Sequence, residues 1–135
     1  MISQTSKYAL QILGFLVSAS GDRARSGDIA EKTGIPANYL SKILNQLRKQ
    51  GLVEAEKGWG GGFRLRQDAL DRPIEEILAA IDGIDSTRCE ECVYGQSECD
   101  SENPCPLHPY WERIRDTYRE MLSQTTVADL GKKAG

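Results

Sequence analysis

The sequence predicts a mainly α-helical fold that carries one small β-hairpin. Apolar residues recur at three- and four-residue intervals in several segments, as on the buried face of a helix. Between two of these segments, a glycine-rich stretch is flanked by short runs that alternate apolar and polar residues, as in a hairpin. With 135 residues, the chain is long enough for one compact domain.

The first half of the chain contains three predicted helices, over 3–19, 26–32 and 36–51. A glycine at or just after each end favours termination there. Ser26 is the expected N-cap of the second helix, and Pro36 fits the first turn of the third. The short turn between these two helices matches a helix-turn-helix.

The third helix predicts a DNA-reading surface. Its apolar stripe is formed by Leu40, Ile43, Leu44 and Leu47. Its other side chains can all donate hydrogen bonds and none is acidic: Asn38, Tyr39, Ser41, Lys42, Asn45, Gln46, Arg48 and Lys49. In a helix-turn-helix, the second helix lies in the major groove and basic residues elsewhere contact phosphates. A merely solvated polar face is the alternative, but the absence of acidic residues favours DNA.

The next segment, LVEAEKGWGGGFRLR over 52–66, predicts a hairpin with a glycine-rich tip. Such a hairpin beside a helix-turn-helix is typical of a wing. The sequence therefore predicts a winged helix-turn-helix. We expect the following wing residues to contact DNA: Lys57, Trp59, Gly60, Gly61 and Arg64. For Trp59, packing on the hairpin is the alternative. A phosphate-binding nucleotide loop is excluded because no Gly-Lys-Ser/Thr and no helix follow the glycines.

The charge distribution agrees with a division into two parts. The chain has a net charge of −3, but residues 1–66 carry a net +5 and residues 67–135 a net −8. A basic first half and an acidic second half are typical of a DNA-binding portion joined to a sensing or pairing portion. Accidental asymmetry of a solvated surface is the alternative.

The second half predicts a helix over 71–82 and a long helix over 110–123. In the long helix, a narrow apolar seam is formed by Trp111, Ile114, Tyr118 and Met121. We expect this seam to pair with a second copy, although packing within one chain is the alternative. A homodimer would match a palindromic operator in double-stranded DNA.

Localisation decides how the cysteines are interpreted. No apolar run approaches the roughly 20 residues of a membrane-spanning helix. The N-terminus loosely mimics a signal peptide, but Gln11 interrupts its apolar stretch, which also has helical spacing. We therefore expect a cytoplasmic protein with no membrane partner. A reducing cytoplasm favours metal binding or redox chemistry over structural disulfides.

All four cysteines and the only histidine lie in the acidic stretch CEECVYGQSECDSENPCPLH, over 89–108. One zinc ion could use four of these five ligands. The wide spacing of Cys92, Cys99 and Cys105 instead suits an iron–sulfur cluster. A redox dithiol of Cys89 and Cys92 is a third interpretation. No paired carboxylates or nucleophile–base set indicates an enzyme or a small-molecule substrate.

Together these motifs resemble the iron–sulfur regulators of the IscR, NsrR and RirA group. The resemblance extends from TSKYAL through NYLSKILNQLRKQGLV and KGWGGGFRL to TTVADL. It implies a dimeric transcriptional regulator whose long helices cross and whose control of transcription depends on a cluster, and we expect a repressor. It implies a division into a winged helix-turn-helix over 1–83, a cluster loop over 84–109 and a dimerisation segment over 110–135.

By position in this resemblance, Cys92, Cys99 and Cys105 match the three cluster cysteines. His108 matches the fourth ligand of the IscR type, which favours a [2Fe–2S] over a [4Fe–4S] cluster. The NsrR type takes an acidic ligand near the N-terminus, where this chain has Lys7, whose ammonium has no lone pair. Cys89 is not required by the pattern and stays an alternative fourth ligand.

Overall fold

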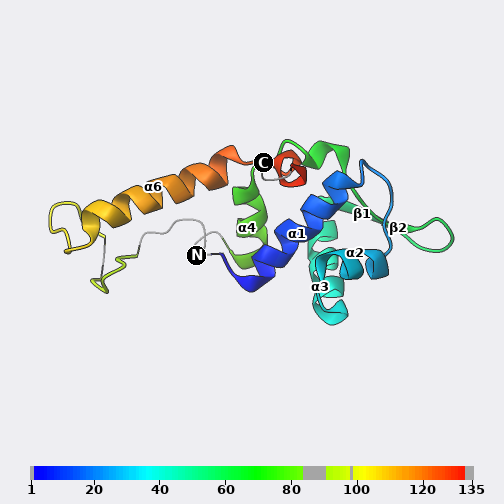
Figure 1. Ribbon diagram of the computed structural model, residues 1–135, viewed down its shortest axis with the longest axis horizontal. Helices are drawn as coiled ribbons and strands as arrows, with labels where there is room; N and C mark the ends of the chain where they lie inside the picture. Colours follow the sequence, from blue (N-terminus) through cyan, green and yellow to red (C-terminus); the bar gives the residue numbers. More distant parts are fainter. Residues whose placement is uncertain (1, 84–90, 98, 133–135) are drawn as a thin grey trace.

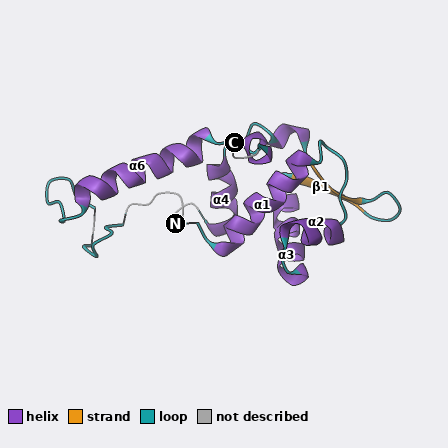
Figure 2. Cartoon of the chain, in the orientation of Figure 1, coloured by secondary structure: helices purple, strands orange, loops and turns teal. Residues whose placement is uncertain are grey.

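The computed structural model describes residues 2–83, 91–97 and 99–132, which are mainly helical with one hairpin (Figure 2). Its α-helices and strands are α1 (Gln4–Ser18), α2 (Ser26–Thr33), α3 (Ala37–Lys49), β1 (Val53–Glu56), β2 (Gly62–Leu65), α4 (Ile74–Asp82) and α6 (His108–Gln124). Short 3-10 turns, η1 (Gln67–Ala69) and η2 (Ala128–Gly131), complete the order. The predicted fold class is confirmed.

Helix α1 forms the centre of the protein. Its buried side chains are Ser6, Ala9, Ile12, Leu13 and Leu16. It packs against α2, α3, α4, β2 and η2. The Ser3 hydroxyl caps its start by accepting a hydrogen bond from the Ser6 backbone N–H at 3.0 Å, which satisfies one of the free N–H groups of the first turn.

Helices α2 and α3 form the expected helix-turn-helix. Gly34 ends α2 at φ 73°, a left-handed conformation that glycine adopts without steric cost. Ser26 is not the N-cap as predicted, because Arg25 occupies that position and makes no side-chain capping bond. The predicted apolar stripe of α3 is buried along its whole length.

Strands β1 and β2 pair antiparallel, with Val53 opposite Leu65 and Glu56 opposite Gly62. A third segment joins this sheet, because Ala24 and Phe63 exchange two backbone hydrogen bonds of 2.8 Å. The segment before α2 therefore fixes the base of the wing.

Helix α4 begins at Ile74, three residues later than predicted, with Pro73 at its N-cap position. The reason is a contact that is distant in sequence. The Ile74 backbone N–H donates to the carbonyl of Thr125 at 2.8 Å, and Pro73 forms a bridge with Thr126. The segment after α6 thus holds the start of α4 extended.

Helix α6 begins at His108 and extends away from the body formed by α1 to α4 (Figure 1). It is anchored near its C-terminal end, where Tyr118 and Leu122 pack against Ile74 and Leu78. Its other end is preceded by the segment that contains Cys92, Cys99 and Cys105, which is called the cysteine-containing loop below. The wing projects on the opposite side of the molecule (Figure 1).

After α6 the chain returns to α1. Val127 is fully buried in the same core as α1 and α3, and Leu130 packs against that core. Lys132 and the N–H and hydroxyl of Thr126 bond to the Asp129 carboxylate and lower its pKa to about 2. None of the described helices is long and apolar enough to cross a membrane.

The contact between α1 and η2 predicts the effect of a single methyl group. A Cβ added at Gly14 would lie 2.9 Å from the backbone oxygen of Leu130. Although alanine is the better helix former, we expect Gly14→Ala to destabilise the protein by about 1–3 kcal/mol, the usual cost of overpacking. The measurement is urea unfolding followed by circular dichroism.

Gly27→Ala is the matched control. Gly27 lies in α2 with no atom within 4 Å of an added Cβ. This variant should be as stable as the wild type or more stable by up to about 1 kcal/mol. Equal stability of Gly14→Ala and Gly27→Ala would contradict a tight contact between α1 and η2.

Candidate functional site

The polar face of α3 lies open to solvent. The five α3 residues that were predicted to contact DNA are exposed: Asn38, Tyr39, Ser41, Lys42 and Gln46. Tyr39 also lies beside Tyr8 of α1, with ring centroids 6.2 Å apart and the rings tilted by 51°. The start of α3 is therefore both presented to solvent and supported from α1.

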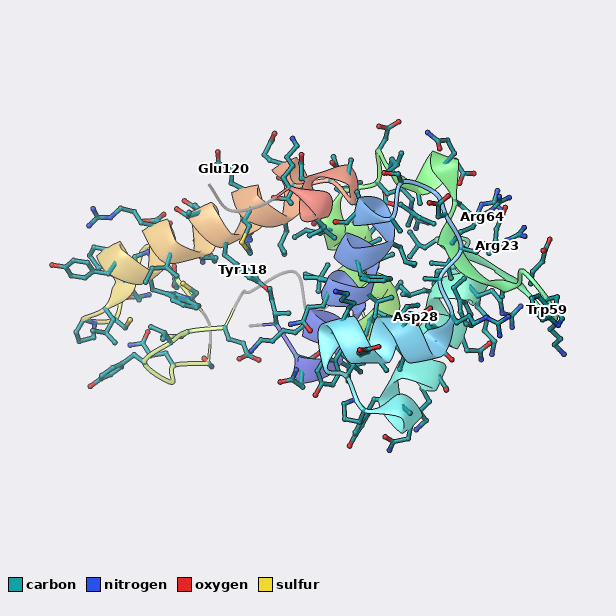
Figure 3. The ribbon with its side chains drawn as sticks, turned by 45° about the vertical axis from the view of Figure 1, so that its right-hand side comes forward. Arg23, Asp28, Trp59, Arg64, Tyr118 and Glu120 are labelled. Carbon is teal, nitrogen blue, oxygen red and sulfur yellow. The ribbon has the colours of Figure 1, made fainter. Side chains whose placement is uncertain are left out.

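The wing presents Trp59 at its outer end. This side chain is fully exposed and lies far from the body of the protein (Figure 3). Lys57 and Gly60 are exposed beside it, whereas Gly61 is buried. A side chain at Gly61 would collide with the backbone oxygen of Glu56, so glycine is required there for close approach within the turn.

Each arginine at the wing is paired with a carboxylate. Arg64 donates to Glu54 from Nε at 2.9 Å and approaches it from Nη2 at 2.8 Å. Arg66 makes two 3.1 Å bonds to Asp68, which raise the pKa of Arg66 and lower that of Asp68. These pairs fix the positions of the two guanidinium groups on the second strand of the hairpin and just after it.

Arg23 also lies at the wing, although no local pattern in the sequence predicts it there. Its Nη1 lies 2.6 Å from Glu56, and it approaches the Gly60 carbonyl at 3.5 Å. Figure 3 shows Arg23 and Arg64 near the same part of the hairpin. The contact arises because the segment at Ala24 joins the sheet, a pairing that local patterns do not reveal.

The second group of predicted site residues gathers at the start of α6. The His108 backbone N–H donates to the Cys105 carbonyl at 3.1 Å, and the Cys99 sulfur lies 3.6 Å from His108 Nδ1. Cys105 is buried, and both it and Cys92 are free thiols, with a hydrogen bond from Cys105 contributing to a lowered pKa of Cys92. The donors thus form two pairs, Cys92 with Cys105 and Cys99 with His108. Cys89 lies outside the described residues.

The pKa of the Cys92 thiol lies below its ordinary value. Burial acts to raise it, but hydrogen bonds from the backbone of Gln96, Tyr94 and Gly95 and from Cys105 outweigh this effect. A turn of backbone N–H groups around a sulfur stabilises the thiolate, which is the form that binds metals.

His108 is a buried histidine whose ring can still act as a donor of electron pairs. The residue is only 7% exposed. Its Nε2 makes no hydrogen bond within the part of the chain that the structure describes, and the nearest carboxylate, of Glu112, is 3.8 Å away. A buried polar atom without a hydrogen bond lowers the stability of the folded protein by about 1–3 kcal/mol. A bond from Nε2 to a further group would remove this cost.

No three His, Cys, Asp or Glu side chains among the described residues are arranged to hold a single metal ion. The four predicted ligands Cys92, Cys99, Cys105 and His108 are instead brought together two by two.

Two residues of α6 bind the cysteine-containing loop. Trp111 donates from Nε1 to the Glu91 carbonyl at 3.0 Å, so this member of the predicted dimer seam holds the loop. Arg115 was not predicted as a site residue, and it donates from Nη1 to the Cys99 sulfur at 3.1 Å.

The remaining seam residues differ in exposure. Tyr118 is buried against its own chain, whereas Ile114 and Met121 are 51% and 41% exposed. Together with Arg113 and Thr117 they line a shallow groove along α6. An apolar groove on a helix that leaves the body is the kind of surface that a second helix covers.

Comparison with known proteins agrees with this fold. Residues 2–133 match the model of the Rrf2 family, described as an iron-dependent transcriptional regulator. The HTH-type transcriptional regulator IscR of Escherichia coli is 30% identical over 131 residues, which are 96% of this chain and 78% of IscR.

Solved structures with the same fold include further regulators. CymR, the global cysteine regulator of B. subtilis, is 26% identical with a TM-score of 0.72, covering 97% of this chain and 95% of CymR. IscR of T. potens is 23% identical with a TM-score of 0.66, covering 96% and 85%. These relatives are transcriptional regulators, which are not enzymes. This chain, matched by the family model over almost its whole length, belongs to the Rrf2 family of transcriptional regulators.

Proposed function

We propose that this Rrf2 regulator is a cytoplasmic repressor whose binding to a palindromic operator is controlled by an iron–sulfur cluster. The cluster ligands are Cys92, Cys99, Cys105 and His108. The signal would be iron supply, redox state or nitric oxide, each of which changes such a cluster.

The observation that carries this proposal is the pairing of the donors at the start of α6. A [2Fe–2S] cluster needs two protein ligands for each of two irons, and the pairs Cys92 with Cys105 and Cys99 with His108 supply that number. The backbone N–H groups around Cys92 favour its thiolate, and the unpartnered Nε2 of His108 leaves the ring able to reorient toward a metal. The donor set therefore fits the cluster.

When bound, the cluster would supply a group that is oxidised, reduced or lost in response to the cell. The chain would hold it with three thiolates and one imidazole, while Trp111 keeps the loop on α6 through Glu91. Loading or loss of the cluster would therefore change how the loop is held on the free end of α6, next to the groove of Ile114 and Met121.

The DNA site would be the exposed face of α3 together with the wing. The base-reading candidates are exposed residues of the second helix of a helix-turn-helix: Asn38, Tyr39, Ser41 and Lys42 in its first half, and Gln46 one turn after Lys42. Lys57, Trp59, Gly60 and Arg64 would contact the DNA backbone or minor groove.

A thiol-regulated protein without a cluster is the second candidate. It is favoured by the hydrogen bond between the Cys92 and Cys105 thiols and by the structural likeness to CymR, which is named as a cysteine regulator. Protein purified without oxygen separates the candidates, because a cluster gives a brown protein with iron and sulfide. A thiol-regulated or zinc-bound protein would be colourless.

The first prediction here concerns DNA. Lys42→Ala and Gln46→Ala should weaken binding to the native operator and leave random duplexes little affected, because base contacts carry sequence discrimination. Arg64→Ala should weaken binding to every duplex and reduce its salt dependence. Titrations by fluorescence anisotropy at several salt concentrations measure both effects.

Glu54→Gln tests the wing from the opposite direction. It removes the carboxylate that pairs with Arg64, so affinity for all duplexes should rise several-fold with a steeper salt dependence. If all four variants bind the operator as the wild type does, α3 and the wing are not the DNA interface.

A second prediction concerns the dimer. Ile114→Asp puts a charge in the groove of α6, which costs several kcal/mol if a partner covers it. Ile114 is half exposed within one chain, so the variant should fold and become a monomer. Sedimentation or light scattering gives the mass, and circular dichroism checks the fold.

Glu120→Gln serves as the control for the dimer, because Glu120 points away from Tyr118 on the other side of α6 (Figure 3). It should remain a dimer. A stable dimer of Ile114→Asp would exclude this groove from the interface.

A third prediction concerns the ligands. Cys92→Ala, Cys99→Ala and Cys105→Ala should each abolish the visible chromophore. His108→Cys should keep a cluster with a shifted spectrum, and Cys89→Ala should resemble the wild type. A colourless Cys89→Ala beside a brown His108→Ala would reverse the assignment and indicate a four-cysteine cluster.

A further inference from the structure

Cys99 lies against one face of α6, between two residues of that helix. His108 and Arg115 are seven residues apart, which places them two helical turns apart on the same face. The Cys99 sulfur is 3.6 Å from His108 Nδ1 and 3.1 Å from Arg115 Nη1. The Cys99 sulfur of the loop therefore contacts α6 between the proposed ligand His108 and the positively charged Arg115.

The Arg115 side chain is held in a position where its charge acts strongly. It is 15% exposed, and its Nε makes no hydrogen bond among the described residues, with Asp116 Oδ1 at 3.9 Å. A guanidinium is always charged at physiological pH. Shielding from water strengthens its interaction with nearby charge, and its Nη1 donates a hydrogen bond to Cys99.

The surrounding loop is acidic. Glu91, Asp100 and Glu102 lie in it, and Glu112 is one turn after His108 on α6. A cluster with three thiolates and one neutral imidazole would add further negative charge, which increases when it accepts an electron. A cation bonded to one of the thiolates offsets this charge most in the reduced state.

Building on the proposed function, we propose that Arg115 is a positioning residue that holds the Cys99 thiolate and raises the reduction potential of the cluster. Hydrogen bonds to cluster sulfurs and net charge are among the factors that set such potentials. The side chain would also slow loss of the cluster, because it fixes the ligand that the loop brings to α6.

The test is an anaerobic redox titration of the loaded full-length protein with dithionite, followed by visible absorbance. Arg115→Met removes both the charge and the hydrogen bond at nearly the same length. The ratio of reduced to oxidised cluster at a given potential should drop about tenfold. For a one-electron couple, this corresponds to a midpoint potential lower by about 59 mV. Arg115→Lys keeps the charge and should restore most of the potential.

Arg119→Met is the matched control, because it removes the same charge from the same helix one turn further on. It should leave the potential close to that of the wild type. Iron and sulfide content, the visible spectrum and the half-life of the cluster in the presence of a chelator are recorded for each variant. Arg115→Met should lose its cluster several times faster than Arg119→Met.

Each outcome decides the proposal. A loaded Arg115→Met with the wild-type potential, or with the same shift as Arg119→Met, would overturn it and leave the proposed function intact. A wild type without iron and sulfide would overturn both. If Arg115→Met folds but holds no cluster, a loaded Arg115→Lys supports the proposal and an empty one contradicts it.

Discussion

The burial of α1 between the helix-turn-helix and the C-terminal turn is the constraint on which the rest of the structure depends. One side of α1 packs on α3 through residues such as Leu13 and Leu16, and Gly14 gives close access to Leu130. The last part of the chain must therefore return to the first helix. This return positions Thr125 to hold the start of α4, and α4 in turn supports Tyr118 of α6.

Among the described residues, α6 packs on the body near its C-terminal end, and its start lies far from the wing (Figure 1). Within one protomer, the proposed cluster ligands therefore do not touch the proposed DNA surface. A link between them must pass through packed elements. Asp82, at the end of α4 where the chain leaves for the loop, accepts hydrogen bonds from Ser3 and Ser6 at the start of α1. In the proposed regulation, this contact would connect the end of α4 to the helix that supports Tyr39.

Local patterns in the sequence were sufficient to predict the helices, the hairpin and the fold class, because each depends on apolar spacing and glycine positions within a short segment. They failed where distant segments decide. The start of α4 depends on Thr125, and the position of Arg23 depends on the pairing of Ala24 with Phe63. For the site, the family resemblance supplied the proposed ligands, which stay a prediction, whereas the contact of Arg115 with Cys99 depends on how the loop packs on α6. Apolar spacing along α6 also could not separate Tyr118, which packs on its own chain, from Ile114, which does not.

The paired arginines of the wing suggest how a protein with a net charge of −3 can bind DNA selectively. Arg23 and Arg64 form ion pairs with Glu56 and Glu54. Binding of either arginine to a DNA phosphate would have to replace this carboxylate partner. Exposed ion pairs of this kind contribute about 0–1 kcal/mol each, so their exchange costs little. The pairing of these arginines with carboxylates would still lower the non-specific attraction of the wing for any duplex. The acid-free face of α3 has no such competitor among its own side chains, so in the proposed interface discrimination between sequences would fall to that helix.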